Sequence, residues 1–269
     1  MPSRASTDSL LSFTGVVTAV FAPYAVLCVT VVAKQPELII LTVGAAFLWL
    51  CTISAVAILW WALVPVRNTL WVLVVYGAVL QEVGRWATYA LYQRLMQGLR
   101  AIGLMPTPAT GQAVDAVLVS ASIASAIGAG SMQTLVMYGD VLGGALLPGT
   151  LYTPQCPTLS VFAVDALQCL AFQLMHLFLS LIGWTAAYQR RSWPLLAAMA
   201  ALHLLASGTT LLNSSNFVIS GSGGCLLALP CLYAVVFATG CIAAYVAASA
   251  VRVPPRKVHA KTPGDHADD

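Results

Sequence analysis

Charged side chains are scarce in this chain of 269 residues. Asp, Glu, Lys and Arg together make up 8% of it, against about 25% in a typical globular domain. Hydrophobic residues make up 59%. This deficit excludes an ordinary soluble domain and indicates an integral membrane protein. The net charge of +3 reflects the topology described below, so we expect the lipid bilayer, and no nucleic acid, as a partner.

Metal-binding and catalytic patterns are missing as well. The seven cysteines form no CxxC pair and no metal-ligand spacing. The sequence contains no HExxH motif and no serine with a paired base. An aspartyl protease needs two carboxylates that share a proton. Asp115 falls at the predicted cytosolic side of its span and Asp165 near the predicted outer side of the next, so most of the bilayer separates them. We therefore predict no cofactor, no metal, no catalytic residues and no enzymatic activity of the chain itself.

Long apolar stretches dominate what is present. Each is about 20 residues or longer, enough to cross a hydrocarbon core of roughly 30 Å as a helix. We predict an all-α polytopic fold with one seven-span domain over residues 1–251 and a short disordered cytosolic tail over 252–269. The predicted spans are 10–33, 38–64, 70–95, 113–138, 159–188, 193–212 and 225–250.

Basic residues orient these spans. With the N-terminus outside, nine of the twelve Lys and Arg residues fall in cytosolic segments, two fall outside and Arg85 lies within a span. The positive-inside rule then predicts a lumenal or extracellular N-terminus and a cytosolic C-terminus. The nine are Lys34, Arg94, Arg100, Arg190, Arg191, Arg252, Arg256, Lys257 and Lys261.

Two cysteines stand apart from the other five. Cys156 and Cys225 both fall at the predicted outer side, where an oxidising compartment would permit a disulfide. Most of the others sit inside spans, where cysteine behaves as a small hydrophobe. Because position alone does not require pairing, the sequence favours leaving Cys156 and Cys225 unpaired.

Four ionisable residues lie deep in the predicted spans. Glu82 and Arg85 are three residues apart on one helix face, while His176 and His203 lie in adjacent spans. A charge at the bilayer centre costs at least about 2.5–3.5 kcal/mol, so such residues usually face protein or water. Glu82 and Arg85 could form an internal ion pair, or they could form a substrate or proton site. The ion pair is favoured because the two opposite charges neutralise each other.

Depth places three of these residues at one level. At about 1.5 Å per residue, Glu82, His176 and His203 each lie roughly 18–22 Å from the predicted cytosolic boundary. The very short turn between their spans makes the two histidine helices antiparallel neighbours, so their rings can meet. The alternatives are a metal site, a proton relay, and a structural or partner-facing polar cavity; two histidines without a third ligand make a poor zinc site, and the cavity is favoured.

A stripe of small residues marks the fourth span. Ser122, Ala126 and Gly130 recur every four residues. Small side chains at this interval let two helix backbones approach closely in a membrane. The stripe predicts close helix packing without identifying the helix that packs there.

Several of these stretches together resemble one family. Residues 81–86 (QEVGRW) are similar to the QEVxR(F/W) segment in span three of the anterior-pharynx-defective (Aph) subunit family of γ-secretase. Residues 21–25 (FAPYA) and 38–50 resemble its first two spans, and 174–176 (LMH) and 203–213 resemble its two histidine-bearing segments. The small-residue stripe matches the family's GxxxGxxxG, with Ser122 and Ala126 in place of two glycines.

The resemblance implies a non-catalytic scaffold subunit. It implies presenilin, nicastrin and the small fourth subunit of γ-secretase as partners, and a membrane of the endoplasmic reticulum, Golgi, endosome or cell surface as location. It marks Glu82, Arg85, His176 and His203 as cavity or assembly residues, and Ser122, Ala126 and Gly130 as helix-packing residues. The alternative from another class is a seven-span transporter or receptor that uses the same polar cavity for a small ligand or protons.

Overall fold

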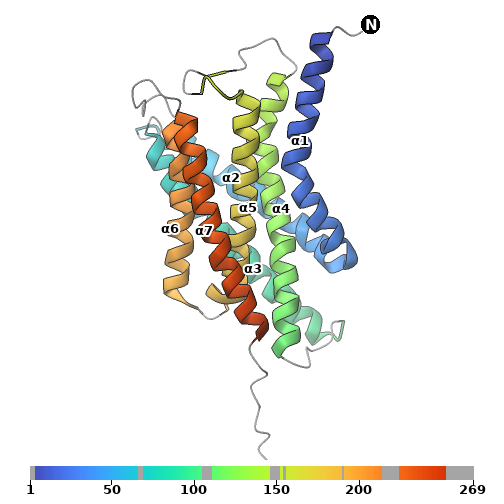
Figure 1. Cartoon of the computed structure of the whole chain (residues 1–269). Helices are drawn as coiled ribbons and strands as arrows, with labels where there is room; N and C mark the ends of the chain where they lie inside the picture. The colour runs from blue at the N-terminus through green and yellow to red at the C-terminus, as the bar shows by residue number, and fades with distance from the viewer. Residues whose placement is uncertain are drawn as a thin grey trace, which may run out of the picture.

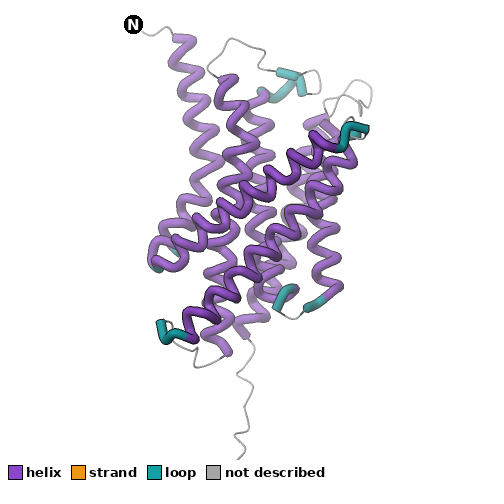
Figure 2. The backbone as a smooth tube through the Cα atoms, turned by 180° about the vertical axis from the view of Figure 1, so that it is seen from behind, coloured by secondary structure: helices purple, strands orange, loops and turns teal. Residues whose placement is uncertain are grey.

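The computed structural model describes residues 4–65, 69–104, 111–145, 152–153, 156–189, 191–213 and 224–252. These residues form seven α-helices that run alternately up and down the bundle, and no strand occurs within them (Figures 1 and 2). The all-α prediction is confirmed. Residues 253–269 of the predicted tail lie outside the described residues. The helices are α1 (Arg4–Thr30), α2 (Pro36–Ala62), α3 (Leu70–Ala101), α4 (Gly111–Ala145), α5 (Val161–Ile182), α6 (Trp193–Thr209) and α7 (Gly224–Arg252).

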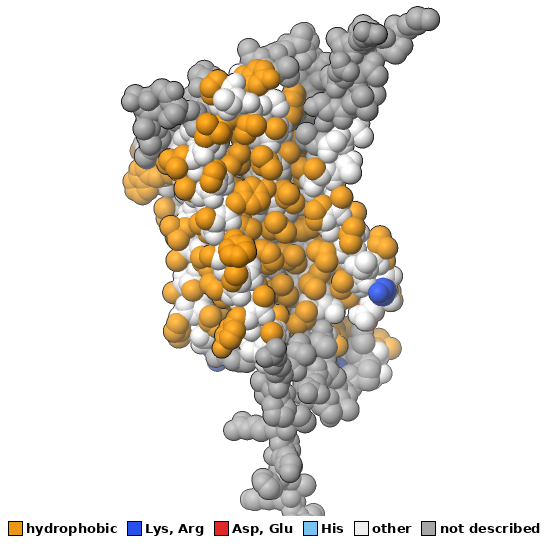
Figure 3. Space-filling view, in the orientation of Figure 1, with side chains coloured by type: hydrophobic (Ala, Val, Ile, Leu, Met, Phe, Trp, Pro, Cys, Tyr) orange, Lys and Arg blue, Asp and Glu red, His pale blue; other side chains and the backbone are white. Residues whose placement is uncertain are grey.

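The outer surface is that of a membrane protein. Six of the seven helices contain a stretch long and apolar enough to cross a bilayer. Hydrophobic side chains cover most of the face shown in Figure 3, and the Lys and Arg side chains visible there lie in its lower half. The exception is α3, because Gln81, Glu82 and Arg85 interrupt its apolar run. The chain is an integral multi-pass membrane protein.

Helix ends follow local chemistry. Pro36 and Pro194 lie in the first turns of α2 and α6, where a missing backbone N–H has no intrahelical partner to lose. The side chain of Ser160 caps α5 by accepting a hydrogen bond from the backbone N–H of Ala163, at 3.3 Å. The chain leaves α3 through Gly103, whose φ of 75° is in the left-handed region that glycine tolerates.

The centre of the bundle is formed by α4 and α5. In each of their apolar stretches 61% of residues are buried, against 11% in α2. Since only the inner faces of the other helices are covered, these two are the elements around which the rest pack. A single π-helical turn, Gly183–Ala187, continues α5 and is buried throughout.

Cys156 and Cys225 form a disulfide. Their Cα atoms are 5.5 Å apart, and the bond joins the segment before α5 to the start of α7. Leu229 and Val164 pack against it in a small apolar cluster. The unpaired state favoured by the sequence is therefore wrong, because sequence position gives only the side of the membrane, whereas pairing depends on how α5 and α7 sit side by side.

Removing this disulfide is expected to lower resistance to thermal unfolding. The bond spans 69 residues, and closing a loop of that length contributes about 2–4 kcal/mol. The C156S/C225S double variant in mild detergent should therefore lose folded protein on heating markedly faster than wild type. Cys241→Ser, at an exposed free cysteine, is the control and should match wild type. Equal heat resistance of all three proteins, with and without reductant, would contradict a stabilising disulfide.

Candidate functional site

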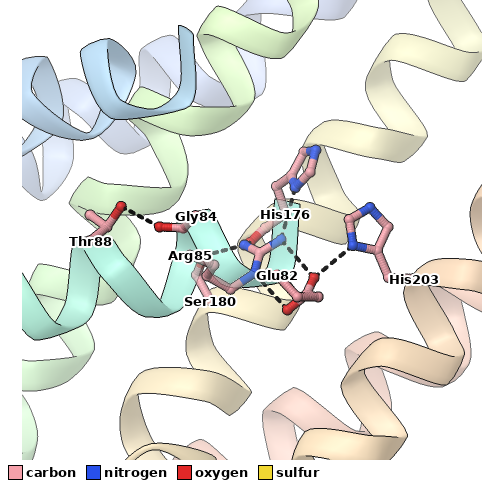
Figure 4. Close-up of polar contacts among 7 residues, drawn as sticks. All are labelled: Glu82, Gly84, Arg85, Thr88, His176, Ser180 and His203. Atoms are coloured by element: carbon pink, nitrogen blue, oxygen red, sulfur yellow. Dashed lines mark hydrogen bonds and ion pairs between the residues drawn. The ribbon is translucent and has the colours of Figure 1, made fainter. Parts of the chain in front are cut away.

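The four buried ionisable residues form one contiguous network. Glu82 and Arg85 come from α3, His176 from α5 and His203 from α6 (Figure 4). Arg85, His176 and His203 are 2%, 0% and 1% exposed, and the Glu82 side chain is 15% exposed. The two imidazole rings meet edge to face with centroids 5.7 Å apart. Helices far apart in sequence thus meet through polar groups in the interior of the bundle.

Arg85 uses every N–H of its guanidinium. Nε donates to Glu82 Oε2 at 3.2 Å, and Nη2 donates to Glu82 Oε1 at 3.3 Å. Nη1 donates to the hydroxyl of Ser180 at 2.7 Å and to the backbone carbonyl of His176 at 3.2 Å, while the second Nη2 hydrogen points to His176 Nδ1 at 3.1 Å. A guanidinium has five donors and no acceptor, so this charge is fully satisfied.

These contacts define the hydrogen positions on both histidines. Because Arg85 can only donate, His176 Nδ1 must accept, and its ring hydrogen lies on Nε2. Nε2 is buried and has no hydrogen-bond partner among the described residues. His203 Nδ1 lies 2.6 Å from Glu82 Oε1, and since that carboxylate accepts, His203 donates. Glu82 therefore bridges α3 to α6, and Arg85 bridges α3 to α5.

An aromatic residue of α2 closes the network. The ring of Trp49 lies 4.8 Å from the ring of His176 and 5.6 Å from the guanidinium carbon of Arg85. Its indole N–H donates to Gln133 Oε1 on α4 at 3.0 Å. An arginine over the face of a tryptophan gains cation–π attraction. The polar network is thereby tied to five of the seven helices.

The arrangement joins three helices through side-chain contacts. No set of three or more His, Cys, Asp or Glu side chains in the described ranges could bind a metal ion. Asp115 and Asp165 lie near the starts of the antiparallel helices α4 and α5, at opposite ends of the bundle. Removing one partner of a buried ion pair strongly destabilises the folded protein. The geometry therefore supports a role in fixing the relative positions of α3, α5 and α6.

The small-residue stripe of α4 packs inside the chain. Ser122 and Ala126 are both 0% exposed. Gly130 lies beneath the phenol ring of Tyr24 on α1, whose hydroxyl donates to the backbone carbonyl of Gln173 on α5 at 2.6 Å. The tightest approach is at Gly128, where an added Cβ would overlap the backbone carbonyl oxygen of Thr42 on α2 and lie 3.0 Å from the backbone nitrogen of Ala46.

The structure adds residues to those singled out from the sequence. Ser180 follows His176 by one helical turn, so extending the polar stripe of α5 by four residues would have found it. Trp49 carries no comparable signal, because α2 is apolar on every side. Gly128 could be read from the sequence as one of the small residues that widen the groove beside the stripe, but not as a point of backbone contact. The proposed roles of the predicted residues in a complex stay predictions.

A seven-helix membrane bundle built around a buried ionic network that joins α3, α5 and α6 defines the class of this protein. Its family follows from comparison. The family model described as Aph-1 protein matches residues 11–250. The chain belongs to the Aph-1 family.

Named relatives are similar over most of their length. The gamma-secretase subunit Aph-1 of Drosophila melanogaster is 28% identical over 208 residues, covering 77% of this chain and 84% of the relative. The gamma-secretase subunit APH-1B of Homo sapiens is 27% identical over 241 residues, covering 85% and 89%. The gamma-secretase subunit APH1-like protein of Arabidopsis thaliana is 25% identical over 213 residues, covering 78% and 82%.

Proposed function

We propose that this protein is a non-catalytic assembly subunit of a γ-secretase complex. The observation that carries the proposal is the buried network of Glu82, Arg85, His176 and His203, which joins helices but presents no nucleophile, metal set or carboxylate pair. Membership of the Aph-1 family supports it, since the relatives bear the name of γ-secretase subunits. Intramembrane proteolysis would then be carried out by presenilin, with nicastrin and the small fourth subunit as further partners.

The four network residues would act by shaping the surface that partners bind. His176 and His203 are 0% and 1% exposed, so a partner helix would contact the outer faces of α3 and α6, whose positions against α5 the network sets. The stripe of Ser122, Ala126 and Gly130 would contribute by keeping α4 close to α1 and α2. The protein would reside in the endoplasmic reticulum, Golgi, endosomal or plasma membrane, where such a complex is assembled and used.

A pulldown in mild detergent tests this function. The tagged chain, expressed in cells of its own source, is expected to co-purify with presenilin, nicastrin and the small fourth subunit, identified by mass spectrometry. Depleting the chain should lower the amounts of those proteins in the assembled complex. Isolation of the chain as a monodisperse monomer that responds to a small ligand would instead favour a transporter or receptor.

Replacing both network histidines is expected to reduce assembly several-fold. His203→Ala removes the hydrogen bond to Glu82, and His176→Ala removes an acceptor of Arg85; a buried group left without its partner costs about 1–3 kcal/mol. The readout is the amount of presenilin recovered per tagged chain.

The conservative variant His203→Asn serves as the matched control. Its amide N–H₂ can donate to Glu82 from about the position of the imidazole N–H, so recovery should be closer to wild type than with His203→Ala. If the variant with both histidines replaced by Ala gave wild-type recovery of presenilin and wild-type protease output, the network would have no role beyond ordinary core packing.

A further inference from the structure

A polar pocket lies at the end of the bundle where α3 ends and α4 begins. Its volume is about 170 Å³. One water molecule needs at least about 10–15 Å³ of space of this kind, so the pocket has room for several waters or one phosphate group. The lining side chains come from α3, α4 and the turn after α5: Tyr89, Tyr92, Gln93, Met96, Arg100, Val117, Leu118 and Gln189. None of them belongs to the network of Glu82, Arg85, His176 and His203.

The polar part of this lining is rich in hydrogen-bond donors. It combines the Arg100 guanidinium, two tyrosine hydroxyls and the amides of Gln93 and Gln189. Both ion pairs found in the described residues involve Glu82, so Arg100 has no carboxylate partner there. The acidic residue close enough to act electrostatically on Tyr92 is Glu37, which is exposed to its surroundings.

One donor of the pocket lining is buried without a partner. Arg100 Nε has no hydrogen-bond partner among the described residues. The indole N–H of Trp184 and the hydroxyl of Tyr188 also lack one, but these two residues do not line the pocket. Trp184 is 0% exposed, and its ring lies 5.4 Å from Tyr89 and 5.2 Å from Tyr92, which line the pocket. Buried polar groups normally have partners, so Arg100 Nε is the atom that an acceptor in this pocket would satisfy.

The apolar part of the pocket lining indicates which kind of hydrogen-bond acceptor would fit there. Met96 and Leu118 are buried, and Val117 is 47% exposed on the outer surface. A pocket that joins a guanidinium and amides to a membrane-facing apolar edge suits a group that is charged at one end and apolar at the other. The same end of the bundle carries Lys34 and Arg191, which were predicted to be cytosolic. Anionic lipids are concentrated in the cytosolic leaflet.

We propose that this pocket binds the phosphate group of an anionic membrane phospholipid. Arg100 pairs with the phosphate, and the tyrosine hydroxyls and glutamine amides donate to its oxygens. The apolar edge formed by Met96, Val117 and Leu118 accommodates the start of the lipid's glycerol and acyl region. The bound lipid would join the end of α3 to the start of α4 and the turn after α5.

The test measures lipid retained by the full-length chain, purified in mild detergent with whatever subunits remain bound. The protein is loaded with phosphatidylserine, washed, and its lipid content is determined by mass spectrometry. Arg100→Gln is expected to retain about tenfold less lipid, since a charge-assisted hydrogen bond is lost. Tyr92→Phe, which removes one hydroxyl and keeps the ring, should retain two- to threefold less and covers the case in which Arg100→Gln folds poorly.

The control variant is Arg94→Gln, on the same helix but exposed and outside the pocket. It should retain as much lipid as wild type. Equal retention by wild type, Arg100→Gln and Tyr92→Phe would overturn the proposal. A parallel arm uses inorganic phosphate alone: if it stabilises wild type but not Arg100→Gln while phosphatidylserine is not retained, the ligand is free phosphate and the lipid assignment is wrong.

Discussion

Replacing Glu82 with Gln is expected to destabilise the folded bundle by about 3–5 kcal/mol, the effect seen when one member of a buried ion pair is removed. Glu82 accepts hydrogen bonds from two nitrogens of Arg85 and one of His203. An amide of the same shape leaves the guanidinium of Arg85, 2% exposed, without a counter-charge. Since total stabilities are about 5–15 kcal/mol, this is a large share of the total, and the variant should unfold at a clearly lower denaturant concentration than wild type in a detergent-denaturation assay.

A double-mutant cycle separates the ion pair from general packing damage. Arg85→Met alone should also be severe, because it leaves the Glu82 carboxylate with His203 as its remaining partner. The E82Q/R85M double variant removes both charges and should be more stable than the sum of the two single losses predicts. Arg94→Gln, at an exposed position on the same helix, should change stability by less than about 0.5 kcal/mol. Strict additivity in the cycle would show that Glu82 and Arg85 do not stabilise the fold as a pair.

Gly128→Ala is expected to destabilise the fold by about 1–3 kcal/mol for one added methyl group. The new Cβ would overlap the carbonyl oxygen of Thr42, and it would lie 3.0 Å from the backbone nitrogen of Ala46. Both obstacles are backbone atoms of α2, so relief requires the whole helix to move. That movement would strain the hydrogen bond from the Thr42 hydroxyl to the carbonyl of Ala124, at 3.1 Å. Gly128→Leu should abolish folding.

Variants at two other glycines of α4 serve as comparisons for Gly128→Ala. Gly139 has open space around it, so Gly139→Ala should be neutral or slightly stabilising through its better helix propensity. Gly130→Ala meets the side chain of Tyr24 rather than backbone, so its effect should lie between the other two, and Gly130→Leu should also reduce the assembled complex. The measurement is the temperature at which half of each variant aggregates in mild detergent. Equal values for Gly128→Ala and Gly139→Ala would contradict the close approach of α2 and α4.

Much of the fold could be predicted because hydrocarbon imposes a simple length rule on apolar helices. All seven helices were predicted, including α3, which is less apolar than the rest. Counting residues from the predicted boundary also placed Glu82, His176 and His203 at one depth, and the structure brings these side chains together. Depth is readable from sequence since each helical residue advances by a fixed distance.

Rotation about each helix axis and the choice of neighbours were harder to predict. In a helix such as α2, which is apolar all round, no periodicity identifies the inward face, so the contact of Trp49 with His176 and Arg85 was missed. The disulfide was missed for the same reason: pairing Cys156 with Cys225 depends on α5 and α7 being adjacent. The small-residue stripe predicted close packing of α4, but Gly128, beside the stripe, makes the tightest approach.

The sequence separation within the network has a consequence for biosynthesis. Glu82 and its partner His203 are 121 residues apart, so at about 5–20 residues per second α3 leaves the ribosome roughly 6–24 seconds before α6 does. During that interval the charges of α3 can pair with each other but not with α6. The hydrogen bond between Glu82 and His203 therefore forms only after α6 has been synthesised, so the buried network is completed late in the biosynthesis of the chain.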